Sequence, residues 1–383
     1  MRRLLTGLLL AAALVGTAAA AQPARVLAVE WAAGGGKLRW VSPTTLQPVG
    51  PAALNVGGAP ANIIAVSPDK KLAAIGGGIE GRLRLVRLPS LRQQGLLWLR
   101  GRSVLKGIWS SPQRLVVLLG DTSPEVVVIE PSTRKVIRRQ QLDGVMRGAL
   151  RVGDRVLTLL TPRARIGPVQ LAVIGADGSV RTVAVPGITA GTEQPAEPED
   201  VARFASPGLV ANGSRAVMLG QDRLVEIDLV SLAVREQRLD TRTTARAEKR
   251  IEGWSRHAVW LSGNTVAYAG WLYDRTGKHT TTGVRLVDVA TGVTRMLDAK
   301  AASVARAGSA LLVHGNGPLR GFALDGTLRF ELLAGDDTGY VQVAGDYAYV
   351  GSGNSTRFTV VDVPAGTVVG SAITAKPTTI FAP

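Results

Sequence analysis

Cysteine is missing from this chain of 383 residues, and histidine is almost missing. Without cysteine there is no disulfide, no thiolate nucleophile and no cysteine-ligated metal. The three histidines are His257, His279 and His314, and no G-x-S-x-G or comparable nucleophile signature occurs. We therefore predict no catalytic residues, no metal site and no cofactor.

Long apolar runs are also scarce. The one such run lies at the N-terminus. Residues 1–21 combine two early arginines, the apolar stretch of residues 4–15 and small residues up to Ala20 and Ala21. This pattern is typical of a signal peptide cleaved near Ala20 or Ala21. It predicts a secreted, periplasmic or cell-envelope protein whose mature domain is 22–383 and has no transmembrane segment, with an uncleaved anchor as the alternative.

Acidic residues are few, with 29 Asp and Glu against 45 Lys and Arg, so the formal net charge is +16. An exported protein this basic attracts anionic partners such as acidic wall polymers or lipid headgroups. The arginines are spread along strand-like segments such as "RLRLVRL". Together with export, this argues against nucleic acid as the partner. A simply solvated arginine-rich surface is the alternative interpretation.

Segments with apolar residues at every second position return along the whole chain, as in "EVVVIEPSTRKVI" and "FTVVDVPAGTVVG". This alternation, bounded by Gly, Pro, Asp and Ser, is typical of short antiparallel strands. The ends of the third strand in successive units are 35 to 60 residues apart, which suits four-stranded propeller blades. We place these ends at Ser42, Arg87, Glu130, Gly175, Asp228, Asp288, Ala323 and Asp362.

The sequence therefore predicts an all-β fold, namely a single β-propeller of four-stranded antiparallel blades. Eight blades follow from the count, and seven is the alternative. The first unit lacks its first strand, while the chain ends in "KPTTIFAP", a first strand with nothing after it. We expect residues 378–382 to pair with residues 25–31 and close the ring, which removes exposed sheet edges.

Two segments carry a family resemblance. "VGGAPANIIAVSPDKKLAAIG" at residues 56–76 and "VVDVPAGTVVGSAITAKPTTI" at residues 360–380 resemble the repeat of bacterial exported propellers of the YVTN type, within the WD-repeat-like superfamily. Lys70 stands where that repeat has glycine, and no Trp-Asp dipeptide occurs. The resemblance implies an exported propeller that acts as a binding module, and it implies no reaction.

The long connections are expected on one face of the disc. They are residues 186–200, an acidic segment, residues 240–253, a basic segment, and residues 270–283, which join strands two and three of one blade. Binding residues tend to lie on loops that a rigid scaffold holds in place. We predict that this face binds the ligand; loops that are merely tolerated there are the alternative.

The unit that begins at Ile251 concentrates aromatic side chains, although aromatic residues make up only 4% of the chain. Aromatic rings beside a carboxylate and a guanidinium suit a sugar, an aromatic ligand or a peptide side chain. The predicted ligand-binding residues are Trp254, Trp271, Tyr273, Asp274, Arg275, His279, Arg246 and Arg250. Packing between blades is the alternative role for the tryptophans.

Two functions are compatible with these sequence features. The leading one is a non-enzymatic, monomeric binding module for a partner protein, a peptide or an anionic cell-envelope polymer. The alternative is a propeller enzyme with a site in the central channel, such as a lactone hydrolase or a quinone-dependent dehydrogenase. The residues expected near the mouth of that channel are basic or apolar, which disfavours a metal: Ile63, Lys106, Arg147, Arg203, Trp254, Gln342 and Thr379.

Overall fold

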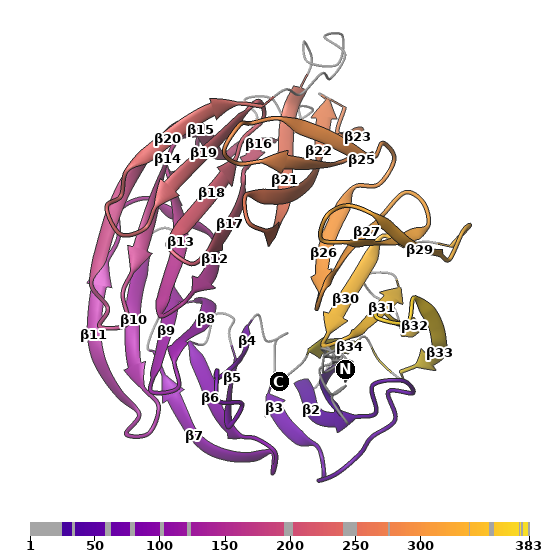
Figure 1. The fold of residues 1–383 in the computed structure, drawn as a ribbon. Helices are drawn as coiled ribbons and strands as arrows, with labels where there is room; N and C mark the ends of the chain where they lie inside the picture. The colour runs from indigo at the N-terminus through magenta and orange to yellow at the C-terminus, as the bar shows by residue number, and fades with distance from the viewer. Residues whose placement is uncertain are drawn as a thin grey trace, which may run out of the picture.

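Strands arranged around a common centre make up the protein (Figure 1). The structure is a computed structural model, and it describes residues 25–32, 35–57, 63–76, 81–99, 103–120, 124–194, 202–239, 251–274, 276–336, 338–351, 356–374, 376 and 378–381. The predicted signal peptide lies outside these residues. No helix in the described part of the chain has the length and apolar character needed to cross a membrane.

Six separate four-stranded antiparallel sheets are present among the described residues. The first contains, in hydrogen-bonded order, β3 (Leu54–Gly57), β2 (Gly35–Val41), β1 (Val26–Ala32) and β34 (Thr378–Phe381). Two more contain β4 (Ile63–Val66), β5 (Leu72–Gly76), β6 (Arg82–Arg87) and β7 (Arg92–Trp98), then β8 (Val104–Ser111), β9 (Arg114–Leu119), β10 (Glu125–Glu130) and β11 (Lys135–Gln141).

The other three separate sheets follow the same pattern. They contain β17 (Gly208–Asn212), β18 (Arg215–Leu219), β19 (Arg223–Asp228) and β20 (Val234–Arg238); β26 (Ser303–Ala307), β27 (Ala310–His314), β28 (Leu319–Ala323) and β29 (Leu328–Leu332); and β30 (Tyr340–Ala344), β31 (Tyr347–Gly351), β32 (Arg357–Asp362) and β33 (Thr367–Ile373).

One larger sheet of ten strands departs from the prediction of eight or seven independent blades. Its order is β12 (Val145–Val152), β13 (Arg155–Thr161), β14 (Gly167–Ile174), β15 (Val180–Glu193), β16 (Arg203–Ser206), β21 (Ile251–Ser262), β22 (Thr265–Asp274), β24 (Val284–Asp288) and β25 (Thr294–Asp298), with β23 (His279–Thr281) paired to β22. Six separate four-stranded sheets are therefore found where eight or seven blades were predicted, because β16 pairs with both β15 and β21 and so joins two predicted units in one sheet.

Burial along a blade explains why its strands differ in sequence. Four consecutive residues of β10, from Val126 to Ile129, are buried, since both faces of this strand lie between neighbouring sheets. The next strand, β11, is exposed at nearly every position and carries Lys135 and two arginines. Apolar inner strands and polar outer strands are what stacked, radially arranged sheets require.

Buried apolar side chains join each sheet to its neighbours. The sheet that contains both chain ends packs on one side through Leu38 and Trp40 against Ile75 of β5. On its other side Val26 packs with Tyr349 of β31, whose hydroxyl donates to the carbonyl of Pro43 at 2.9 Å. The sheet thus lies between its two neighbours, and its packing holds the beginning and the end of the chain together.

The first and the last described strands pair directly. Strand β34 is antiparallel to β1, from Leu27 opposite Phe381 to Glu30 opposite Thr378, as the sequence predicted for these segments. Gln342 of β30 adds a second link to β34. Its Nε2 donates to the carbonyl of Thr378 at 3.1 Å, and its Oε1 accepts from the amide of Ile380 at 2.6 Å. One buried side chain therefore ties the last strand to the neighbouring sheet.

Replacing Gln342 with Ala leaves the Thr378 carbonyl and the Ile380 amide without their side-chain partner. Because such groups are costly when buried, we expect Gln342→Ala to lower the free energy of unfolding by about 2–4 kcal/mol. The control is Gln93→Ala, where the amide lies on an exposed outer strand and the loss should stay below about 1 kcal/mol. Chemical denaturation measures both; equal losses would contradict the role of Gln342.

Candidate functional site

The centre of the ten-stranded sheet collects the segments that were predicted from the sequence as long loops. We call this part the bridging sheet; it consists of residues 190–193 of β15, Arg203–Ser206, residues 251–255 of β21, residues 270–274 of β22 and His279–Thr281. In Figure 1 it lies beside β17 of the separate sheet β17–β20. It joins the unit that precedes this sheet in sequence to the unit that follows it.

Two of the three predicted loops are therefore largely strand. Residues 186–193 belong to β15, and residues 271–273 of β22 pair antiparallel with residues 279–281 of β23. Residues 195–200 and 240–250 lie outside the described residues. The loop prediction failed because the glycines of these segments, which usually mark turns, here lie in strands that pair with β14, β16 and β21.

Neighbouring residues on a strand point to opposite sides, so the bridging sheet has two distinct faces. One face carries Ala205, Trp254 and Leu272, which form a buried apolar cluster with Ile166. Trp254 is only 7% exposed. The sequence placed Trp254 at the central channel, whereas the structure places its indole in this packing cluster, the alternative role considered for the tryptophans.

The opposite face lines a cavity of about 760 Å³. The strands that border the centre of the molecule, β8, β12, β17, β21 and β26, supply the remaining walls. From the bridging sheet come the hydroxyls of Thr192, Ser206 and Ser255 and the rings of Phe204 and Tyr273. A volume of this size is typical of sites for small molecules.

The ring of Phe204 packs against a position that has no side chain. Gly253 is its register partner on β21, and a Cβ at Gly253 would come within 2.6 Å of the Phe204 ring. The Phe204 ring lies edge-on to Tyr273, with centroids 4.7 Å apart. Tyr273 in turn approaches His279 at 5.8 Å, and His279 lies 4.6 Å from Trp271. The rings thus form a continuous row on the cavity face of the sheet.

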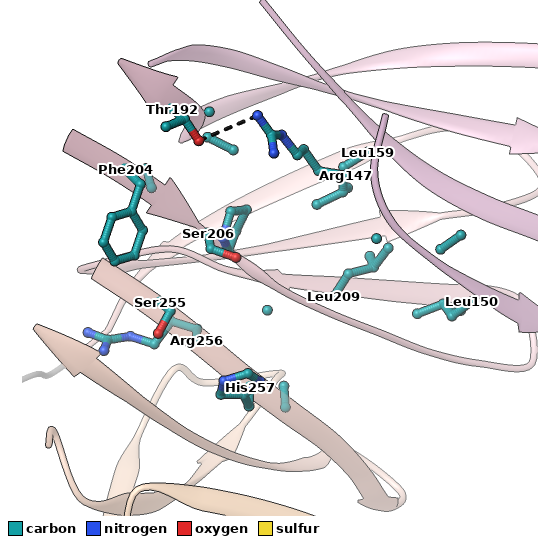
Figure 2. Close-up of a pocket in the computed structure, with 18 of the residues that line it drawn as sticks. Arg147, Leu150, Leu159, Thr192, Phe204, Ser206, Leu209, Ser255, Arg256 and His257 are labelled. Carbon is teal, nitrogen blue, oxygen red and sulfur yellow. Dashed lines mark hydrogen bonds between the residues drawn. The ribbon is translucent and has the colours of Figure 1, made fainter. Parts of the chain in front are cut away.

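Positive charge lines the cavity. Lys106 of β8 and Arg147 of β12 have exposed side chains, and Nη2 of Arg147 donates to Oγ1 of Thr192 at 3.4 Å. Figure 2 shows Arg147 and Thr192 on one side of the labelled residues and His257 on the other, with Ser206 between them. None of the lining residues in the described part of the chain is Asp or Glu. The cavity therefore favours an anion.

His257 faces the cavity from β21, and burial by the surrounding protein lowers the pKa of its imidazole. A second histidine, His314 of β27, is buried, with Nδ1 3.0 Å from the carbonyl of Thr338. Burial is the main cause that lowers the pKa of His314, and the nearby His257 lowers it further. His257 and His314 are therefore close enough to interact electrostatically.

Arg256 also borders the cavity, but its guanidinium is engaged by neighbouring segments and supports the bridging sheet. Its side chain is buried, with Nη1 donating to Oγ1 of Thr282 and Nη2 to the carbonyl of Gln221, each at 3.2 Å. Its Nε has no acceptor among the described residues. Burial lowers the pKa of Arg256 to about 10. Since Gln221 belongs to the link between β18 and β19, Arg256 connects the bridging sheet to the sheet β17–β20.

Of the other predicted site residues, Asp274 has a structural role and three arginines lie outside the described residues. Asp274 shapes the turn of the β22–β23 hairpin, because its Oδ1 accepts from the amide and hydroxyl of Thr276 and from the amide of Lys278. These hydrogen bonds, that from the Thr276 hydroxyl first, lower the pKa of Asp274. Arg246, Arg250 and Arg275 lie outside the described residues.

Sequence reasoning placed Lys106 and Arg147 near the channel mouth but did not include them among the ligand-binding residues. It also missed Phe204, Ser206 and Ser255. The position of Lys106 and Arg147 near the start of a first strand was the available signal. No local signal marks Phe204 and Ser206, since only the pairing of β16 with β15 and β21 brings them to the cavity.

Solved structures share this fold at low sequence identity. The dihydro-heme d1 dehydrogenase NirN in complex with DHE is 12% identical with a TM-score of 0.62, over 92% of this chain and 74% of that chain. AztD from Citrobacter koseri is 12% identical with a TM-score of 0.60, over 93% and 96%. The C-terminal WD40 domain of Sif2 is 12% identical with a TM-score of 0.51, over 84% of each chain.

These similarities define the fold class as a β-propeller, and at this identity they define the fold alone. Neither a protein-family model nor the sequence of a curated protein matches the chain. In the described part of the chain, no three or more His, Asp or Glu side chains are grouped so that they could hold a metal ion.

The buried histidine predicts how stability depends on pH. Because the pKa of His314 is lower in the folded state, the unfolded chain binds more protons once the pH falls below about 6.5, and stability decreases from there toward acid. We expect His314→Asn, which keeps a donor for the Thr338 carbonyl, to lose less stability between pH 7.5 and pH 5 than the wild type.

Denaturation at the two pH values measures this difference. His279→Asn, which alters an exposed histidine, serves as the control and should keep the wild-type pH dependence. An identical acid-induced loss in wild type and His314→Asn would show that His314 does not sense pH.

Proposed function

We propose that the protein is an exported binding module that takes an anionic ligand on the side of the propeller where the bridging sheet lies. A cavity lined by Lys106 and Arg147, without a carboxylate among its described lining residues, is the observation that carries the proposal. The predicted signal peptide and the resemblance to exported YVTN-type propellers support the location outside the cytoplasm. The predicted partners remain a protein, a peptide or an anionic cell-envelope polymer, and we favour the polymer because of the net charge of +16.

We also propose that the ring is closed and has eight blades. Strands β12–β15 form four antiparallel strands, and β21, β22, β24 and β25 form another four. Counting these two groups beside the six separate sheets gives eight. The pairing of β34 with β1 and the apolar clusters on both sides of that sheet support closure.

A propeller enzyme with a central site is the second candidate, because the cavity lies where the innermost strands meet. NirN is a dehydrogenase for dihydro-heme d1, so a propeller of similar fold is compatible with redox chemistry. A metal-dependent lactone hydrolase or quinone-dependent dehydrogenase would need converging oxygen ligands. The described lining residues offer basic, hydroxyl, aromatic and aliphatic side chains in their place, and we rank the binding module first.

Charge removal at the cavity tests the binding module. We expect the variant Lys106→Gln with Arg147→Gln to bind sulfated dextran at least tenfold more weakly at 50 mM salt, since two contacts to anionic groups are lost. The matched control is Arg92→Gln with Lys135→Gln, which removes the same charge from exposed positions of the outer strands β7 and β11. Neutral dextran tests whether binding requires charge.

Biolayer interferometry measures these affinities. Equal weakening in both double variants would mean that net charge alone drives association and that the cavity side has no special role. Binding of neutral dextran as tight as that of the sulfated polymer would overturn the anionic ligand.

A further inference from the structure

Aromatic rings and cations share one cavity, although they come from different parts of the fold. Lys106 and Arg147 lie on β8 and β12, whereas Phe204 and Tyr273 lie on the bridging sheet. Arg147 is directed toward the bridging sheet by its hydrogen bond to Thr192. Cationic and aromatic side chains therefore line the same cavity of about 760 Å³.

Apolar side chains complete the wall opposite the hydroxyls. Leu150, Leu159, Leu209 and Val304 line the cavity from β12, β13, β17 and β26. A ligand that is only a charged group would leave these side chains and the ring of Phe204 facing water. A ligand that is only apolar would leave the cations near it without a partner, which is unfavourable.

We propose that the cavity binds a small aromatic anion, whose charged group contacts Arg147 and Lys106 and whose ring packs against Phe204 and Tyr273. This inference rests on the anionic site of the proposed function and goes beyond it, because it assigns a small aromatic ligand to a cavity whose cations the polymer would also contact. The hydroxyls of Ser206 and Ser255 line the same cavity and donate to the remaining acceptors of the anion.

Bound anion also changes the protonation of His257. The charged and titratable groups that line the cavity with it are Lys106 of β8, Arg147 of β12, Arg256 of its own strand and Tyr273 of β22, and His314 of β27 lies nearby. Because a negative charge in the cavity favours the protonated imidazole, His257 takes up a proton more readily when the ligand is bound. The aromatic anion therefore binds more tightly at pH 5.5 than at pH 7.5.

Naphthalene-1-sulfonate is the probe, because its sulfonate stays ionised across this pH range and its ring tests the aromatic wall. Methanesulfonate carries the charge without the ring, and 1-naphthalenemethanol carries the ring without the charge. Isothermal titration calorimetry with the full mature chain should give a Kd for naphthalene-1-sulfonate at least tenfold lower than for either partial probe. Equal affinity for all three probes, or no binding of naphthalene-1-sulfonate at millimolar concentration, would overturn the proposal.

Three variants separate the contacts. Arg147→Gln should weaken naphthalene-1-sulfonate at least tenfold, and Phe204→Leu about threefold to tenfold. His257→Gln should remove most of the pH dependence of binding. The controls are Lys135→Gln and Phe330→Leu, which alter a cation and a ring on the outer strands β11 and β29 and should leave the Kd unchanged.

Circular dichroism and melting curves verify that each variant folds. Because Arg147 is exposed, Arg147→Gln should fold even if the other variants do not, and it then tests the proposal by itself. An unchanged Kd in Arg147→Gln would overturn the inference. The sulfated-dextran experiment is read separately. Loss of polymer binding in the cavity variant with no binding of the small probe would support the proposed function and reject the aromatic anion.

Discussion

The backbone pairing of the short strand β16 is the interaction on which the candidate site depends. Residues 203–205 pair antiparallel with the end of β15, and residues 204–206 pair parallel with β21. A strand of four residues thereby joins two blade-like units that are separated in sequence by a complete four-stranded sheet. Without this pairing, Thr192, Phe204 and Ser255 would belong to three unconnected segments, and no aromatic wall would face the cations of β8 and β12.

Because side chains alternate along each strand, the two faces of the bridging sheet have different roles. Ala205, Trp254 and Leu272 point inward and stabilise the sheet by apolar packing, while Phe204, Ser206 and Ser255 point to the cavity. Buried Arg256 ties the sheet to the neighbouring blade through Gln221. The packing residues fix the geometry, which leaves the cavity face free to carry rings and hydroxyls, the kind of chemistry that recognises a ligand.

The sequence predicted the all-β propeller class because inner and outer strands differ so clearly, as β10 and β11 illustrate. It also predicted the pairing of the chain ends, since an incomplete first unit and an unpaired last strand complement one another. It could not predict β16, because four residues in the segment "RFAS" have no periodicity of their own. The sequence grouped Trp271, Tyr273 and His279 on one loop, whereas the structure places them in the β22–β23 hairpin, whose strand β22 continues its pairing with β21.

A cross-link measures that pairing directly, and the natural absence of cysteine makes the experiment clean. Ser206 and Ser255 are register partners on β16 and β21, so a chain carrying Ser206→Cys and Ser255→Cys places two thiols side by side. Under mild oxidation, we expect mass spectrometry of the digested protein to show a disulfide between positions 206 and 255 in nearly all molecules. If both thiols stay free and reactive while the protein remains folded, the bridging sheet does not exist and the cavity is not built as described.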